Sequence, residues 1–133
     1  MENINIAFDA IKLYQEQYAQ VDKLWGYFSV ITLAVVGYVI GAKEKVHSLF
    51  ETTVIVIAYL TFCIGNHSAL ILGQEQLHQF AYYAVEISKQ SGMDFSKLNP
   101  LDVIWIKTFH IVVAISVSIS VFILTLIRAK GNK

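Results

Sequence analysis

The chain has 133 residues, of which 56% are hydrophobic and only 15% are charged, whereas soluble domains carry about 25% charged residues. Ten basic side chains balance ten acidic ones, so no net field points to nucleic acid or to an anionic surface as a partner. The single cysteine excludes an intrachain disulfide and a cysteine-rich metal site.

Three long stretches of the sequence contain no charged residue, namely 24–42, 52–74 and 108–127. An α-helix needs about 20 apolar residues to cross a bilayer, so each stretch is long enough. A surface helix of a soluble domain keeps a polar face, which these stretches lack. We therefore predict an all-α, three-pass protein of the cell inner (plasma) membrane, with residues 1–133 forming a single membrane domain. Its spans are expected at about 24–42, 53–73 and 108–127.

The segment before the first span is predicted to be an amphipathic helix. Its apolar side chains recur at steps of four and three residues, the spacing of one helix face. They are Ile4, Phe8, Ile11, Tyr14, Tyr18, Val21 and Trp25. No helix breaker precedes Leu24, so this helix is expected to continue into the first span. Two arrangements fit the pattern: a helix lying on the bilayer surface, or a self-associating stem outside the membrane.

Small residues recur every four positions in the first two spans. Such faces allow helices to approach closely in lipid, where packing drives association. We predict helix packing at Gly37, Gly41, Gly65, Ala69 and Gly73.

The second span also contains Asn66 and His67, two strongly polar side chains in an apolar run. Buried polar groups cost free energy in hydrocarbon unless they find partners. Both residues are therefore candidates for a pore lining or gate, and interhelical hydrogen bonding alone is the alternative. The helical pattern continues after Gly73, so the second helix is expected to project beyond the lipid and to end at Ser91–Gly92.

The third helix is predicted to begin at Pro100, because Asn99 can cap it and proline is favoured at the first helical position. It is expected to run to about Arg128. Within it, Ser116 and Ser120 share one face and are further pore or gate candidates. Their hydroxyls can instead bond back to carbonyls of their own helix.

Four side chains are candidates for a pore entrance or an anion-binding surface: Lys89, Lys97, Lys107 and His110. Lys107 and His110 are three residues apart, so they share a helix face at the mouth of the third span. Copies assembled around an axis would present these residues as a charged ring, a device that channels use for selectivity. The alternative is a lysine that extends to the headgroups beside a histidine.

No phosphate-binding glycine loop, catalytic motif or metal-ligand spacing occurs in the sequence, so we expect no enzymatic activity, no cofactor and no metal. Residues 1–23 and 74–107 must share one side of the membrane, because two spans separate them, and they are expected to form an extramembrane helical bundle. The basic residues are divided equally, five on each side. Those of the short turn and tail are densest near the spans, which favours a cytosolic turn and tail.

In size and layout the chain resembles the small multi-spanning effectors of bacterial anti-phage defence systems, of the Hailong-like kind. The resemblance rests on the stem of residues 3–23, the three spans, the Asn66–His67 pair and the helical extension after Gly73. It implies a pore that permeabilises the inner membrane when a nucleotide or oligonucleotide binds the extramembrane bundle. It also implies that the N-terminus is cytosolic, opposite to the preference from charge density.

Three helices are too few to enclose a conduction path, so the sequence favours a homo-oligomeric ion channel whose helical bundle acts as a lid or sensor. The expected partners are the lipid bilayer and further copies of the chain. The alternative function is a non-catalytic accessory or scaffold subunit of a larger membrane complex.

Overall fold

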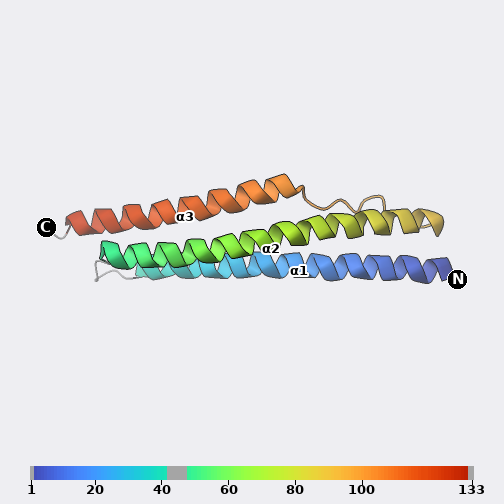
Figure 1. The fold of residues 1–133 in the computed structure, drawn as a ribbon, viewed down its shortest axis with the longest axis horizontal. Helices are drawn as coiled ribbons and strands as arrows, with labels where there is room; N and C mark the ends of the chain where they lie inside the picture. The colour runs from blue at the N-terminus through green and yellow to red at the C-terminus, as the bar shows by residue number, and fades with distance from the viewer. Residues whose placement is uncertain (1, 42–47, 132–133) are drawn as a thin grey trace. The chain divides into compact units, whose positions relative to one another are not determined.

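The computed structural model describes residues 2–41 and 48–131. It contains three helices, α1 (Glu2–Gly41), α2 (Leu49–Gln90) and α3 (Val103–Gly131) (Figure 1). Each helix includes a stretch that is long and apolar enough to cross a membrane. The prediction of an all-α chain with three membrane-compatible helices is therefore confirmed. Ala42, the last residue of the first predicted span, lies outside the described residues.

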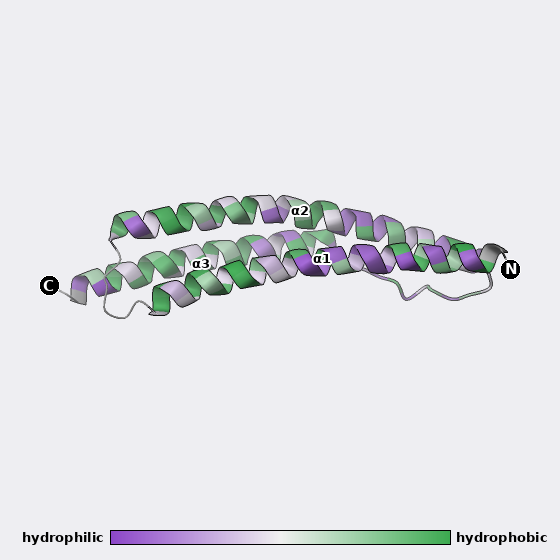
Figure 2. Cartoon of the chain, turned by 90° about the horizontal axis from the view of Figure 1, so that it is seen from below, coloured by the Kyte–Doolittle hydropathy of each residue, from purple (hydrophilic) through white to green (hydrophobic). Residues whose placement is uncertain are grey.

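Hydropathy is distributed unevenly along the helices. Hydrophilic residues are concentrated in the N-terminal half of α1, whereas α3 is hydrophobic over most of its length (Figure 2). The charged residues of α3 lie only near its ends, at Lys107, Arg128 and Lys130. A helix with this distribution suits a bilayer, because its charged residues can reach the water on either side.

The described residues form two packing units. The first combines the chain up to Trp25 with Ser68–Ile106, and the second combines Gly26–His67 with the chain from Lys107 onward. Helices α1 and α2 are therefore each divided between the two units.

In the first unit, the N-terminal part of α1 packs against the C-terminal part of α2. On the α2 side of this contact, Leu77, Ala81 and Ala84 are all buried. The buried face of α1 is offset from its predicted apolar stripe. Ala7 and Ala10 are buried, whereas Ile4 is 44% exposed and Phe8 is 59% exposed. Small side chains on both helices permit a closer approach than large ones, so they take the inward positions.

Gly73 sets the distance between α1 and α2 in this unit. The Gln17 side chain donates a hydrogen bond of 2.9 Å to the Gly73 carbonyl. A Cβ atom at Gly73 would lie 3.2 Å from Cγ2 of Val21, which is closer than ordinary van der Waals contact. Gly73 therefore lies at a helix–helix contact. Val21 also packs with Leu70 and Leu77 in the apolar core of the unit.

The two ends of α2 carry recognisable caps. At the start, Ser48 and Glu51 form a reciprocal capping box, in which each backbone N–H donates to the other side chain, at 3.1 and 3.2 Å. At the end, Met93 N–H donates to Ser88 O and Gly92 N–H donates to Lys89 O. Gly92 has a φ of +72°, the left-handed conformation that this motif requires. The helix thus ends at the predicted place.

The predicted start of α3 at Pro100 is wrong, because the helix begins at Val103. The Asp102 carboxylate accepts a hydrogen bond of 3.0 Å from Ile104 N–H, which makes Asp102 the N-cap. Pro100 instead belongs to the segment between α2 and α3, which runs back along α2 (Figure 1). The Leu101 carbonyl accepts bonds from the side chains of Gln74, at 2.6 Å, and His78, at 3.0 Å. These contacts hold Leu101 out of the helix.

The second unit brings all three helices together around an apolar cluster of Val39, Val56 and Val121. The Arg128 guanidinium donates hydrogen bonds to the carbonyls of Val39 and Ile40. Carbonyls in the last turn of a helix have no partner within the helix, so Arg128 satisfies two of those at the end of α1.

Candidate functional site

A buried polar cluster in the second unit is formed by Asn66 and His67 of α2 and His110 of α3. Asn66 is 7% exposed and His110 is 1% exposed. His67 is half-buried. The Phe28 ring of α1 packs on His110 with ring centroids 4.0 Å apart. All three helices therefore contribute to one buried site, to which we refer as the imidazole cluster (Asn66, His67 and His110).

One direct hydrogen bond orders the cluster. Asn66 Nδ2 lies 3.3 Å from His110 Nε2. An amide nitrogen only donates, so Nε2 of His110 accepts this bond. The rings of His67 and His110 have centroids 5.0 Å apart and planes tilted by 48°. Two imidazoles are thus neighbours among apolar residues.

His67 Nδ1 is buried and has no hydrogen-bond partner among the described residues. A buried polar atom without a partner costs free energy, because it loses the hydrogen bonds that water would supply. A structure that retains such an atom commonly brings a water molecule or another polar group to it. This nitrogen is therefore the point of the cluster at which a further partner is expected.

Two other polar pairs cross between helices in the second unit. The hydroxyls of Thr52 and Thr125 lie 2.9 Å apart, and those of Thr32 and Tyr59 lie 3.0 Å apart. The sequence analysis did not select these four residues. Hydroxyls within the apolar runs are the signal that could have found them, because each has to find an acceptor in lipid.

Ser116 and Ser120 do not join the imidazole cluster. Both are exposed in the single chain, and Ser120 Oγ donates to the Ser116 carbonyl at 2.8 Å. Ser118, which was not a candidate, faces inward and bonds the Ala114 carbonyl. The hydroxyls of Ser118 and Ser120 therefore bond back to their own helix.

The glycines of the first two spans lie on open faces of the single chain. A Cβ atom added at Gly37, Gly41 or Gly65 would meet no atom within 4 Å. Ala69 is half-buried. Among these predicted packing residues, Gly73 makes a close interhelical contact in its own chain. Packing at the three open glycines requires a neighbour from outside the chain.

The candidate basic residues are divided between the two units, with Lys89 and Lys97 in the first and Lys107 and His110 in the second. Lys89 is exposed and forms an ion pair of 2.8 Å with Glu86, whose carboxylate raises the pKa of the ammonium. Lys97 is exposed on the segment between α2 and α3, and Lys107 is half-exposed near the start of α3. His110 belongs to the imidazole cluster. Lys43, Lys45 and His47 lie outside the described residues, as does Lys133.

Among residues 2–41 and 48–131, no three or more His, Cys, Asp or Glu side chains gather to hold a metal ion. No known family, curated protein or solved structure matches the chain. Fold and site together define a class: an all-α chain whose three apolar helices suggest a multi-pass membrane protein. Within it, polar groups are buried between the helices.

Proposed function

We propose that the chain assembles into a homo-oligomeric ion channel or pore-forming membrane effector. Its extramembrane helical bundle, residues 1–23 and 74–107, acts as the gate. The observation that carries the proposal is the imidazole cluster, and above all the unpartnered Nδ1 of His67. Water in a conduction path would hydrate this nitrogen in the middle of an apolar span, as pore-lining polar groups are hydrated in channels.

The outward faces of the helices support assembly from several copies. Gly37 and Gly65 are open to close approach by another helix. Ser116 and Ser120 form a polar strip on the exposed face of α3. Three helices cannot enclose a path by themselves, so neighbouring copies would pack against these faces and complete a path that includes the imidazole cluster of each chain.

A role in phage defence is supported by the resemblance in layout alone. In that role the protein is a non-enzymatic effector of the inner membrane, and a nucleotide or oligonucleotide bound near Lys89 and Lys97 opens it. Induced expression together with the activating signal should then collapse the membrane potential of cells, measured with a voltage-sensitive dye. Cells that stay polarised while they carry the assembled protein would remove the effector role.

One observation favours the accessory or scaffold alternative. Thr52 bonds Thr125, Thr32 bonds Tyr59 and Asn66 bonds His110, so these interior polar side chains are paired within a single chain. Interhelical bonds of this kind stabilise membrane helix packing by about 1 kcal/mol each. A protein that only holds a larger complex together needs nothing more.

Ion flux into proteoliposomes separates the two functions. A channel should admit ions at a rate that falls in Asn66→Leu while the oligomer mass stays the same, because the substitution removes a polar group from the path. Thr53→Val is the matched control, since Thr53 is exposed and bonds only the Leu49 carbonyl of its own helix. Liposomes that admit no ions, even after residues 1–23 are deleted, would favour the scaffold.

The cytosolic position of the gate has its own test. Ser96 is exposed on the segment between α2 and α3, and the one natural cysteine, Cys63, is buried. In a Cys63→Ala background, Ser96→Cys should resist an impermeant thiol reagent in intact cells and react after lysis. Labelling from outside would place the bundle on the outer side and contradict a gate that responds to a cytosolic signal.

A further inference from the structure

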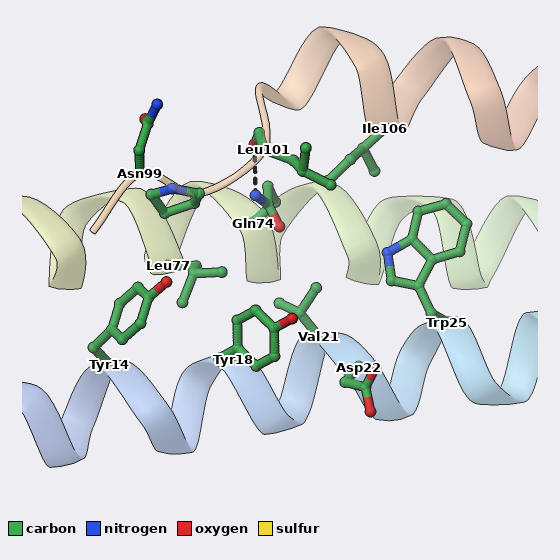
Figure 3. Close-up of a pocket in the computed structure, with 11 residues that line it drawn as sticks. Tyr14, Tyr18, Val21, Asp22, Trp25, Gln74, Leu77, Asn99, Leu101 and Ile106 are labelled. Atoms are coloured by element: carbon green, nitrogen blue, oxygen red, sulfur yellow. Dashed lines mark hydrogen bonds between the residues drawn. The ribbon is translucent and has the colours of Figure 1, made fainter. Parts of the chain in front are cut away.

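The first packing unit contains a pocket of about 270 Å³ (Figure 3). Figure 3 shows Tyr14, Tyr18 and Trp25 reaching it from α1, and Gln74 and Leu77 from α2. The segment around Leu101 closes one side, where the Gln74 side chain bonds the Leu101 carbonyl. The volume is near the lower end of the range for sites that hold small molecules.

The charge of the pocket selects against anions. Asp22 is the one charged residue in its lining. It pairs with no basic side chain among the residues that the structure describes. The unit as a whole is acidic, because residues 1–25 and 68–106 hold eight Asp and Glu against four Lys and Arg. Lys89 and Lys97 do not line the pocket, so Asp22 would repel a phosphate or carboxylate from it and attract a cation.

The aromatic residues supply the second element of cation recognition. The rings of Tyr14 and Tyr18 have centroids 6.4 Å apart, and the Trp25 indole lines the same pocket. Aromatic faces attract organic cations through their quadrupole, and quaternary ammonium groups are bound in this way. Burial, with a further contribution from Tyr18, raises the pKa of Tyr14, so its phenol stays uncharged at neutral pH.

The position of the pocket along the chain favours a ligand with an apolar body. Trp25 and Gln74 lie next to the predicted ends of the first and second spans, where headgroups meet hydrocarbon. Leu77 and Val21 add apolar wall beside the polar groups. A ligand that partitions into this layer of the membrane could reach the site directly.

We propose that this pocket binds a quaternary ammonium ion carrying an apolar body, with the charge beside Tyr18 and Asp22, and with Tyr14 and Trp25 lining the pocket on either side. The ammonium belongs either to a soluble organic cation or to a choline headgroup of a lipid. This binding goes beyond the proposed function and does not require the chain to conduct. Failure of the binding and failure of conduction are therefore separate results.

Trp25 provides the readout for a test on the full-length protein in nanodiscs. The other tryptophan, Trp105, is 70% exposed and lies outside the pocket, so Trp105→Phe leaves Trp25 as the only indole. Benzyltrimethylammonium should change the Trp25 fluorescence in a saturable way. Its uncharged isostere neopentylbenzene should bind more weakly, and adenosine monophosphate should not bind. Calorimetry on the wild type gives a second measurement of the same affinities.

Asp22→Asn should weaken benzyltrimethylammonium binding by about fivefold, because it removes one exposed carboxylate whose attraction for the cation is of the order of 1 kcal/mol. Asp9→Asn, an exposed carboxylate of the same helix outside the pocket, should leave the affinity unchanged. Competition by phosphatidylcholine in the nanodisc would identify the lipid headgroup as the source, and its absence would identify a soluble cation. The proposal would be overturned if the two substitutions had equal effects, or if the isostere bound as tightly as benzyltrimethylammonium. It would also be overturned if adenosine monophosphate bound more tightly, or if neither measurement detected binding.

Discussion

In this apolar chain, buried polar residues on different helices depend on one another for hydrogen bonding. Asn66 and His110 lie on different helices and satisfy each other through one hydrogen bond of 3.3 Å. Removing either one leaves the other buried without that partner. Such a group costs about 1–3 kcal/mol, which is more than the net contribution of the bond itself.

A double-mutant cycle on Asn66→Leu and His110→Phe measures this dependence. Each single change should lower the free energy of unfolding in detergent by about 1–3 kcal/mol. The double variant should lose about 1 kcal/mol less than the sum of the two, because neither substitution then leaves the other residue's polar group without its partner. Ser118→Ala serves as control, since Ser118 bonds only a carbonyl of its own helix. Strict additivity of the two changes would show that the residues do not interact in the assembled protein.

The sequence indicated Asn66 and His67 correctly as buried or half-buried polar residues, because a polar side chain in an apolar run is visible locally. It grouped His110 with Lys107 instead, on the basis of their spacing along one helix. It also favoured Ser116 and Ser120, whereas Ser118 faces inward. Spacing shows which residues share a helix face, but contacts with the neighbouring helices decide which face points inward.

At the level of helices, a local signal predicted the end of α2 correctly. The predicted start of α3 was wrong because contacts between residues distant in the sequence determine it. Gly92 was recognisable because only glycine readily adopts the left-handed conformation of the C-terminal cap. Near the start of α3 two capping residues were present, Asn99 and Asp102. The hydrogen bonds from Gln74 and His78 to the Leu101 carbonyl favour the second. Those contacts cross 23 or more residues of sequence and are invisible in a local pattern.

Gly92→Ala tests the cap of α2. The substitution should lower the free energy of unfolding by about 1–2 kcal/mol, because a Cβ atom is strained at a φ of +72°. Gly26→Ala is the matched control: Gly26 lies within α1, and a Cβ there meets no atom within 4 Å. It should be neutral or stabilise the helix by up to about 1 kcal/mol. Similar thermal denaturation curves for the two variants would contradict the assigned cap.

At the level of the whole molecule, the architecture was predictable because bilayer thickness sets the length of an apolar run. The offset of the buried face of α1 was not predictable from the sequence. Ala7 and Ala10 are less hydrophobic than Ile4 and Phe8, so a pattern of large apolar residues does not select them. Neither hydropathy nor spacing indicates how many copies assemble. The open glycines of α1 and α2 give a way to test assembly directly.

Gly65→Leu should reduce the oligomer to smaller species without unfolding it. Within its own chain a Cβ atom at Gly65 meets no atom within 4 Å, so a loss of oligomer with the fold retained would point to a contact with another copy. Native mass spectrometry in detergent reports the mass, and circular dichroism reports the helix content. Ile64→Leu, at the exposed neighbouring position, should leave both unchanged. An oligomer of unchanged mass in Gly65→Leu would show that this face is not an interface.

Electrical recording from purified protein in planar bilayers tests the central proposal most directly. If copies of the chain form a channel, discrete current steps should appear once the bundle is displaced by deletion of residues 1–23 or by its activating ligand. Asn66→Leu should then reduce the conductance, and Lys107→Glu should shift the reversal potential toward cation selectivity if Lys107 forms a ring at the pore entrance. Bilayers that remain silent under all of these conditions, with the protein shown to be inserted, would contradict the channel and leave the scaffold.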